Sequence, residues 1–197
     1  MPARNFSGPV SATIVLCAIS LASPRAAEPA EAPEVAQPCL ACHGEVLGEG
    51  VPPIAGHFNN YIQLQLVAFR SGRRQNEIMQ GMAAGLSDND IRALGKYFSS
   101  LPIPAAATQA DEQPDLTKAG QRTAAQFRCA NCHGDKFLGS QGAPRVAHLP
   151  EFYVAKALTD YRANTRPSSG GGAMTEVAGG LSDDNIKTLA HYLAVLP

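Results

Sequence analysis

The spacing of apolar residues predicts the same amphipathic helix near the middle and at the end of the chain. Apolar side chains recur at intervals of three and four residues in two stretches: Ile91, Leu94, Phe98 and Leu101, and then Ile186, Leu189, Leu193 and Leu196. Residues at these intervals share one face of an α-helix, so each helix is predicted to pack on a core along that face. Ser87 and Ser182 are good N-cap residues for the two helices. Asp90 and Asn185 follow three residues later, which makes each start an imperfect capping box.

The two helices belong to a repeat that covers most of the chain. Cys-Leu-Ala-Cys-His-Gly at 39–44 returns as Cys-Ala-Asn-Cys-His-Gly at 129–134, and Pro-Pro-Ile-Ala at 52–55 returns as Pro-Arg-Val-Ala at 144–147. Tyr61 matches Tyr153, and Met79 matches Met174. The offset between the copies grows from 90 to 92 to 95, and only in loops, which indicates a duplicated domain with small loop insertions.

The repeat decides whether the remaining elements are predicted to be helices or strands. Residues 62–66 alternate between apolar and polar, as a strand does, but in the second copy Val154, Leu158 and Tyr161 recur at helical spacing. Both stretches are therefore predicted to be helices. A helix is also predicted from about residue 117 to 128, whereas prolines at 33 and 38 cut short its equivalent in the first copy. No convincing strand remains, so the predicted fold class is all-α.

The predicted organisation is a secretory leader followed by two small domains. Residues 1–22 have the parts of a signal peptide: Arg4, an apolar stretch over 10–22, and a small-x-small cleavage site at Ser-Leu-Ala. Cleavage after Ala27 and an uncleaved anchor are the alternatives, although the apolar run is too short for a transmembrane helix. The mature chain is expected not to be transmembrane and to lie outside the cytoplasm. It divides into a flexible lead-in at 23–33, a first domain at 34–102, a linker at 103–114 and a second domain at 115–197.

Charge and cysteine content narrow the function. The 197 residues carry a formal net charge of −1, so no basic excess is available to neutralise nucleic-acid phosphates. Of the five cysteines, Cys17 lies in the leader. The other four form two pairs, Cys39 with Cys42 and Cys129 with Cys132, and a histidine follows each pair directly.

Cys-x-x-Cys-His is the attachment signature of c-type haem. Two thiols one helical turn apart form thioethers to the vinyl groups of one haem, and the histidine that follows, His43 or His133, then lies under the iron as proximal ligand. Two copies predict two c-type haems. The alternatives fit less well, because a zinc ribbon needs its cysteine pairs about 15–20 residues apart and a thioredoxin-like motif needs a βαβ context. Four cysteines in a secreted chain would ordinarily suggest disulfides, but each pair is only three residues apart and the motif that follows it is wrong for a structural bridge.

Three methionines outside the leader are candidates for the sixth ligand of the iron: Met79, Met82 and Met174. All three are predicted to lie in loops just before the last helix of each copy. The duplication selects Met79 over Met82, because Met79 and Met174 both stand seven residues before the leucine of a Leu-Ser-Asp motif. Met82 stays an alternative axial ligand, as does an open or histidine-ligated iron. His57 and His148 do not match each other in the repeat and are predicted to be loop or surface residues.

Two prolines are candidates for a supporting role. The backbone carbonyls of Pro52 and Pro144 are predicted to accept the Nδ1–H of His43 and His133, which would fix each ring and tune the iron. The alternative is that the prolines only shape a loop. His191 falls on the polar face of the last helix and is predicted to be solvated.

The chain resembles the class I cytochromes c, and most closely the dihaem cytochrome c4 family. The resemblance extends over about residues 34–197 and rests on both CxxCHG motifs, the Pro-x-[Ile/Val]-Ala turn, the methionine segment and the Leu-Ser-Asp helix. It implies two tandem cytochrome c-like domains, each a small helical bundle around one haem, with His43/Met79 and His133/Met174 as axial pairs. The weak first helix departs from the family pattern and implies a more exposed haem or a less stable first domain.

The resemblance implies a periplasmic electron carrier rather than an enzyme. Its expected partners are redox proteins, such as a membrane quinol-oxidising complex or a terminal oxidase. One alternative is a dedicated dihaem cytochrome subunit of a periplasmic dehydrogenase, such as a sulfide or alcohol dehydrogenase. The other is a dihaem peroxidase, which needs one iron with a vacant or displaceable sixth position.

Overall fold

The computed structural model describes residues 31–44, 47, 50–104, 113–140, 142–168 and 172–196. Within these residues the regular structure is helical, apart from an isolated β-bridge between Ser140 and Ala143. This confirms the all-α prediction. The predicted signal peptide 1–22, and most of the lead-in 23–33 and the linker 103–114, lie outside the described residues.

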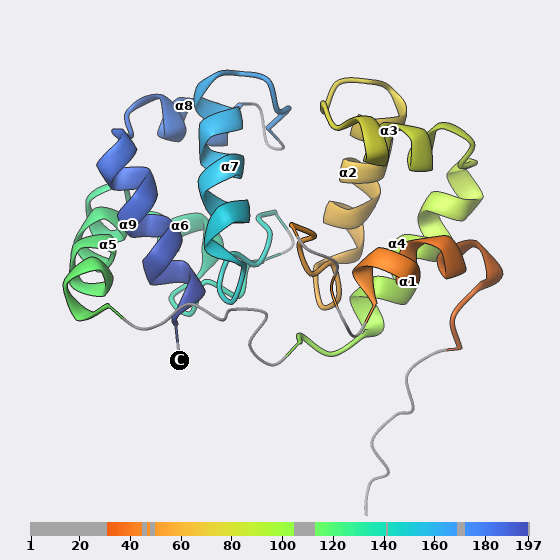
Figure 1. Cartoon of the computed structure of the whole chain (residues 1–197), viewed down its shortest axis with the longest axis horizontal. Helices are drawn as coiled ribbons and strands as arrows, with labels where there is room; N and C mark the ends of the chain where they lie inside the picture. Colours follow the sequence, from red (N-terminus) through yellow and green to blue (C-terminus); the bar gives the residue numbers. More distant parts are fainter. Residues whose placement is uncertain are drawn as a thin grey trace, which may run out of the picture.

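The helices form two groups that lie side by side (Figure 1). The first group contains a short 3₁₀ helix η1 (Glu34–Ala36), α1 (Gln37–His43), α2 (Asn59–Arg70), α3 (Glu77–Ala84) and α4 (Asp88–Ser100). The second contains α5 (Pro114–Gln126), α6 (Ala130–His133), α7 (Glu151–Arg162), α8 (Ala173–Gly179) and α9 (Asp183–Ala194). The two groups match the two predicted domains, and the exact domain boundaries stay predictions.

The last helix of each domain begins as the sequence predicts. Ser87 Oγ accepts the Asp90 amide, while Asp90 Oδ2 accepts the Ser87 amide at 2.9 Å. Ser182 and Asn185 make the same two bonds at 3.1 Å each. Both capping boxes are therefore complete, and each satisfies two backbone N–H groups that a helix start leaves without partners.

A matched pair of arginines ties the middle helix of each domain to the last one. Arg70, at the end of α2, donates to the carbonyl of Leu86 at 2.8 Å and to Asp88 at 2.7 Å. Arg162, at the end of α7, donates to Leu181 and Asp183 in the same way. These bonds hold the end of the segment that connects the two helices of each domain. That segment carries the candidate methionines.

The second domain has a continuous core where α5 crosses α9. Its buried cluster includes residues from α5, α7, α8 and α9, with Leu158, Ile186, Leu189 and Leu193 among them. At the crossing, α5 presents Gly120, whose missing side chain lets α9 approach. A Cβ at this position would lie 2.2 Å from the Thr188 carbonyl oxygen and 2.4 Å from the Tyr192 Cβ.

Replacing Gly120 by alanine is expected to destabilise the second domain by about 2 kcal/mol, because a methyl group at the crossing must push two helix backbones apart. Denaturant unfolding of the haem-loaded protein measures the effect. Gly179→Ala is the matched control, since a Cβ there meets nothing within 4 Å. Equal midpoints for the two variants would show that the helix crossing tolerates a side chain.

The first domain has a smaller core and a shorter first helix. Instead of a counterpart to α5, it has η1 followed by α1, with Pro38 in the first turn of α1, where a proline is tolerated. Ala36 is fully buried and joins Ile62, Leu94 and Phe98 in the buried cluster of this domain. The predicted shortening of the first helix is confirmed, and the 3₁₀ turn partly replaces it by contacting α4.

The prediction that His191 is solvated is wrong. The side chain is buried, its Nδ1 lies 2.6 Å from Glu151 Oε1, and its Nε2 accepts the Gln113 amide at 3.1 Å. Because Nε2 accepts a hydrogen bond, the ring proton is on Nδ1 and is donated to the carboxylate. The equivalent residue in the first domain, Lys96, is exposed, since that domain lacks the long helix whose start covers His191.

None of the helices in the described segments is both long enough and apolar enough to cross a membrane.

Candidate functional site

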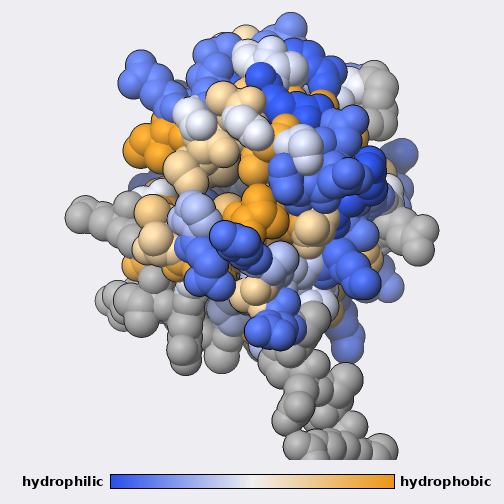
Figure 2. All heavy atoms as spheres, turned by 90° about the vertical axis from the view of Figure 1, so that its right-hand side faces the viewer, coloured by the Kyte–Doolittle hydropathy of each residue, from blue (hydrophilic) through white to orange (hydrophobic). Residues whose placement is uncertain are grey.

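A cavity of about 440 Å³ lies between the helices of the first domain, with residues of the second domain on one side. Cys39, Cys42 and His43 line it on one side, and Met79 and Met82 line it from α3. Its apolar walls come from α2, α4 and the loop before α2: Ile54, Ile62, Leu66, Phe69, Leu94 and Phe98. Figure 2, which looks onto the first-domain side of the molecule, shows apolar surface exposed around a hollow.

The proximal side of the cavity is built by α1. Cys39 and Cys42 are one turn apart on this helix, and His43 is its last residue. The Nδ1 atom of His43 lies 2.9 Å from the Pro52 carbonyl oxygen, so the ring donates its Nδ1–H there and keeps Nε2 free of its proton. Burial lowers the pKa of His43, and the hydrogen bond to Pro52 opposes this shift. A neutral imidazole with an unprotonated Nε2 is the form that binds a metal.

The second domain repeats this arrangement. His133 is buried at the end of α6, and its Nδ1 lies 2.8 Å from the carbonyl oxygen of Pro144. Burial again lowers the pKa of the imidazole, against the effect of the hydrogen bond. Both proline carbonyls thus accept the hydrogen bonds that the sequence assigned to them. Cys129 and Met174 pack against the main core cluster of this domain.

The candidate methionines lie on short helices, so the prediction that they lie in loops is wrong. Met79 is on α3 and Met174 is on α8. The Asn76 side chain accepts the Met79 amide at 2.9 Å and caps α3. The Ser168 hydroxyl accepts the Met174 amide at 2.9 Å. Asn76 is thus the N-cap of α3, whereas α8 begins after Gly172 and the Ser168 hydroxyl satisfies an amide of its first turn.

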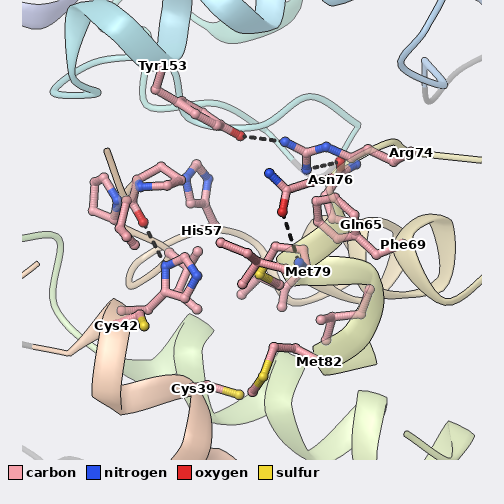
Figure 3. Close-up of a pocket in the computed structure, with 18 of the residues that line it drawn as sticks. Cys39, Cys42, His57, Gln65, Phe69, Arg74, Asn76, Met79, Met82 and Tyr153 are labelled. Atoms are coloured by element: carbon pink, nitrogen blue, oxygen red, sulfur yellow. Dashed lines mark hydrogen bonds between the residues drawn. The ribbon is translucent and has the colours of Figure 1, made fainter. Parts of the chain in front are cut away.

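Met79 and Met82 both reach the cavity. They are three residues apart on α3 and so share one face of the helix. In Figure 3, Met79 points into the cavity, whereas Met82 ends beside the sulfur of Cys39 and is 42% exposed. The position of Met79 therefore suits a ligand at the centre of the cavity better than that of Met82, and the choice between them stays a prediction.

Residues of both domains close the inner edge of the cavity. Arg74 of the first domain donates to Gln65 Oε1 at 2.6 Å and to the Tyr153 hydroxyl at 3.3 Å (Figure 3). Arg166 of the second domain donates to the Tyr61 hydroxyl at 2.9 Å and to the Tyr153 hydroxyl at 3.3 Å. All five side chains line the cavity.

The contacts at this edge are reciprocal. Tyr61 and Tyr153 are equivalent in the repeat, and Arg74 and Arg166 stand at the same offset of 92. Each arginine bonds the tyrosine of the opposite domain. The sequence analysis missed these four residues as a group, although the shared offset is a signal that could have found the arginines.

Among the residues that the structure describes, two arginines are buried beside these contacts with no carboxylate next to them. Arg145 and Arg166 are 0% and 3% exposed, and the charged or titratable groups that act on their pKa values are tyrosines. The Nε atoms of both arginines have no hydrogen-bond partner. A buried cation without a counter-ion is costly, so this region is suited to a ligand that carries an anion.

His57 lies in a loop, as predicted, but it is buried in the same region and is not a surface residue. It is 4% exposed, its ring centroid lies 5.1 Å from that of Tyr61, and its Nδ1 has no partner. Burial and the charges of Arg145 and Arg166 lower its pKa to about 3. Sequence comparison of the copies missed it because two of the charges that act on it, Arg145 and Arg166, belong to the opposite domain. His148 is a half-buried loop residue, as predicted.

Comparison with known proteins identifies the family. The cytochrome c family model matches residues 117–197. A cytochrome c4 from Thiocapsa roseopersicina is 32% identical over 183 residues, which cover 83% of this chain and 95% of that protein. The chain belongs to the cytochrome c4 family. It is a dihaem electron-transfer cytochrome.

Two further comparisons agree with membership of the cytochrome c4 family. The crystal structure of reduced recombinant cytochrome c4 from Pseudomonas stutzeri aligns with a TM-score of 0.72 at 29% identity, covering 82% of this chain and 95% of that chain. A thiosulfate dehydrogenase electron acceptor from Stutzerimonas stutzeri is 32% identical over 172 residues, which cover 81% of this chain and 79% of that protein. Two tandem cytochrome c domains and two c-type haems, as the sequence predicted, follow from family membership.

The residues of the first domain fit a c-type haem. The cavity combines two thiols one turn apart, an imidazole whose Nδ1 proton is already donated, a thioether sulfur and apolar walls. Haem also carries propionate carboxylates, and these anions can pair with the buried guanidinium groups. Arg74 and Arg166 line the cavity and are the residues suited to hold those carboxylates.

Proposed function

We propose that this chain carries single electrons in the periplasm through two His/Met-ligated haems. Cys39, Cys42, Cys129 and Cys132 attach the haems, His43 and Met79 are the axial ligands of the first, and His133 and Met174 are those of the second. The observation that carries the proposal is the matched pair of imidazoles, each with its Nδ1 held on a proline carbonyl at 2.8–2.9 Å.

The protein residues set up the electron transfer. Haem iron, when bound, cycles between the ferrous and ferric states. Pro52 and Pro144 fix the tautomer and the orientation of the histidine rings, so that both rings present Nε2 to the metal in either redox state. The apolar walls exclude water, and methionine ligation favours a high reduction potential. Two methionine-ligated irons leave no open position for a substrate, which argues against a dihaem peroxidase.

Two observations support two different classes of redox partner. The resemblance to cytochromes c4 supports a shuttle that delivers electrons from a quinol-oxidising complex to a terminal oxidase. The similarity to a protein named thiosulfate dehydrogenase electron acceptor supports the second candidate, a cytochrome that receives electrons from a periplasmic dehydrogenase. In both roles the chain is a carrier and makes no product of its own.

An optical redox titration with a pyridine haemochrome assay tests the proposal. We expect two c-type haems per chain, low-spin spectra in both redox states and two one-electron steps. One haem or none would contradict the attachment sites, and high-spin ferric haem would favour the peroxidase.

The mass of the exported protein reports whether the leader is removed after Ala22 or Ala27. Rapid mixing with a reduced dehydrogenase or with an oxidase then distinguishes the two partner classes.

A further inference from the structure

We propose that the second domain completes the haem site of the first, and that Arg166 sets the reduction potential of the first haem from across the domain interface. The inference rests on the proposed function, because it assumes that the cavity between His43 and Met79 holds a haem. It adds that this haem site is shared between the domains rather than built by one of them.

The cavity lining shows the contribution of the second domain. Helix α7 and the segment after it supply Phe152, Tyr153, Lys156, Ala157, Asp160 and Arg166. In Figure 3, Tyr153 enters from the ribbon of the second domain and its hydroxyl meets Arg74 above the cavity. One side of the first haem site is therefore made of residues that stand 50 or more positions beyond the end of the first domain.

Arg166 is held in place by several contacts at once. Its guanidinium lies over the Tyr161 ring, 4.8 Å from the centroid, and over the Tyr153 ring at 5.7 Å. It donates to the Tyr61 hydroxyl at 2.9 Å and approaches Gln65 Oε1 at 3.5 Å. These partners are tyrosines and an amide, so no carboxylate among the described residues pairs with the guanidinium.

The charge of Arg166 acts strongly because it is buried. A charge in the interior of a protein is screened far less than one at the surface. Positive charge near a haem stabilises the reduced state, which carries one positive charge less than the oxidised state. The other cation of α7 at this cavity, Lys156, is half exposed and paired with Asp160 at 2.7 Å, so it contributes little.

The first cavity receives a guanidinium from each domain. Arg74, the repeat counterpart of Arg166, belongs to the first domain, and it lines the same cavity. Its guanidinium lies 4.4 Å from the Phe69 centroid, as that of Arg166 lies over Tyr161, the residue equivalent to Phe69. Both guanidinium groups therefore face the first haem, one supplied by each domain.

Arg166→Gln tests the inference. We expect the oxidation equilibrium of the first haem to shift toward the ferric state by about tenfold, which is 59 mV for a one-electron step. The step of the second haem is expected to move by less than a third of that shift. Arg73→Gln is the matched control, since it removes the same charge from an exposed neighbour of Arg74 that does not line the cavity.

Two more variants keep the test decisive. Met174→His lowers the reduction potential of the second haem. In a titration of this variant, the remaining high-potential step therefore belongs to the haem of the first domain. Arg166→Lys retains the charge and is expected to retain most of the potential, and it serves alone if Arg166→Gln fails to fold. Equal shifts of both haems, or a shift as large in Arg73→Gln, would overturn the inference. Loss of a haem in the unmodified protein would instead contradict the proposed function.

Discussion

The double substitution Cys39→Ser and Cys42→Ser is expected to leave one covalent haem per chain and a largely unfolded first domain. The two thiols stand one turn apart on α1 and line the cavity, so their removal takes away both attachment points of the first haem. The haem of the second domain remains attached through its own pair of cysteines.

The unfolding follows from the size of the apolar core. Among the described residues, the buried cluster of the first domain contains Ala36, Ile62, Leu94 and Phe98, whereas that of the second contains thirteen residues. A cavity of about 440 Å³ occupies the centre of the first domain. Small domains with little buried apolar surface depend on a covalent or metal-bound group for stability, and here the haem supplies it.

The pyridine haemochrome assay and far-ultraviolet circular dichroism measure this result. The matched variant is Cys129→Ser with Cys132→Ser, which is also expected to lose one haem. Because the second domain has the larger core, we expect the loss of helical signal to be smaller for this variant. Two haems in either variant would show that the cysteines are not the attachment sites. Equal loss of helix in both would refute the argument from core size.

Met79→Ala is expected to lower the reduction potential of the first haem by on the order of 100 mV or more, since axial ligands set haem potentials over about 0.8 V. The thioether favours the ferrous iron, so its removal makes the ferric state easier to reach. The substituted iron has an open or water-bound sixth position, and its ferric form is expected to become high-spin. The second haem provides the internal reference.

Met82→Ala is the control for this experiment. Met82 lies on the same face of α3 and is 42% exposed, beside Cys39 rather than at the centre of the cavity. We expect it to keep the charge-transfer absorption of the methionine–iron bond and nearly all of the potential. If Met82→Ala loses the band and Met79→Ala keeps it, the register of the repeat is wrong by one helical turn.

The sequence predicts the helices well because their signals are local. The apolar period of α4 and α9 and the caps at Ser87 and Ser182 are contained within single elements. The duplication then resolved α2, whose own pattern resembles a strand. The short helices that carry Met79 and Met174 were missed because no apolar period is long enough to reveal them, and only the first begins at a side-chain cap, Asn76.

The ligand set of the haem sites could be proposed from sequence, whereas their surroundings could not. Cys39, Cys42 and His43 are adjacent in the chain, so their chemistry is visible without a fold. Burial and then two arginines of the opposite domain lower the pKa of His57, and Arg166 meets Tyr61 across 105 positions. Contacts of this kind come from the packing of one domain on the other, which no single segment encodes.

The crossed bonds between Arg74 and Tyr153 and between Arg166 and Tyr61 have the symmetry of a two-fold homodimer. In a dimer of separate chains, such a contact would be lost on dilution. Here the two partners are parts of one polypeptide, so their association depends on an effective concentration that dilution does not change. The shared haem site is consequently maintained however few copies of the protein are present, and its redox properties do not vary with abundance.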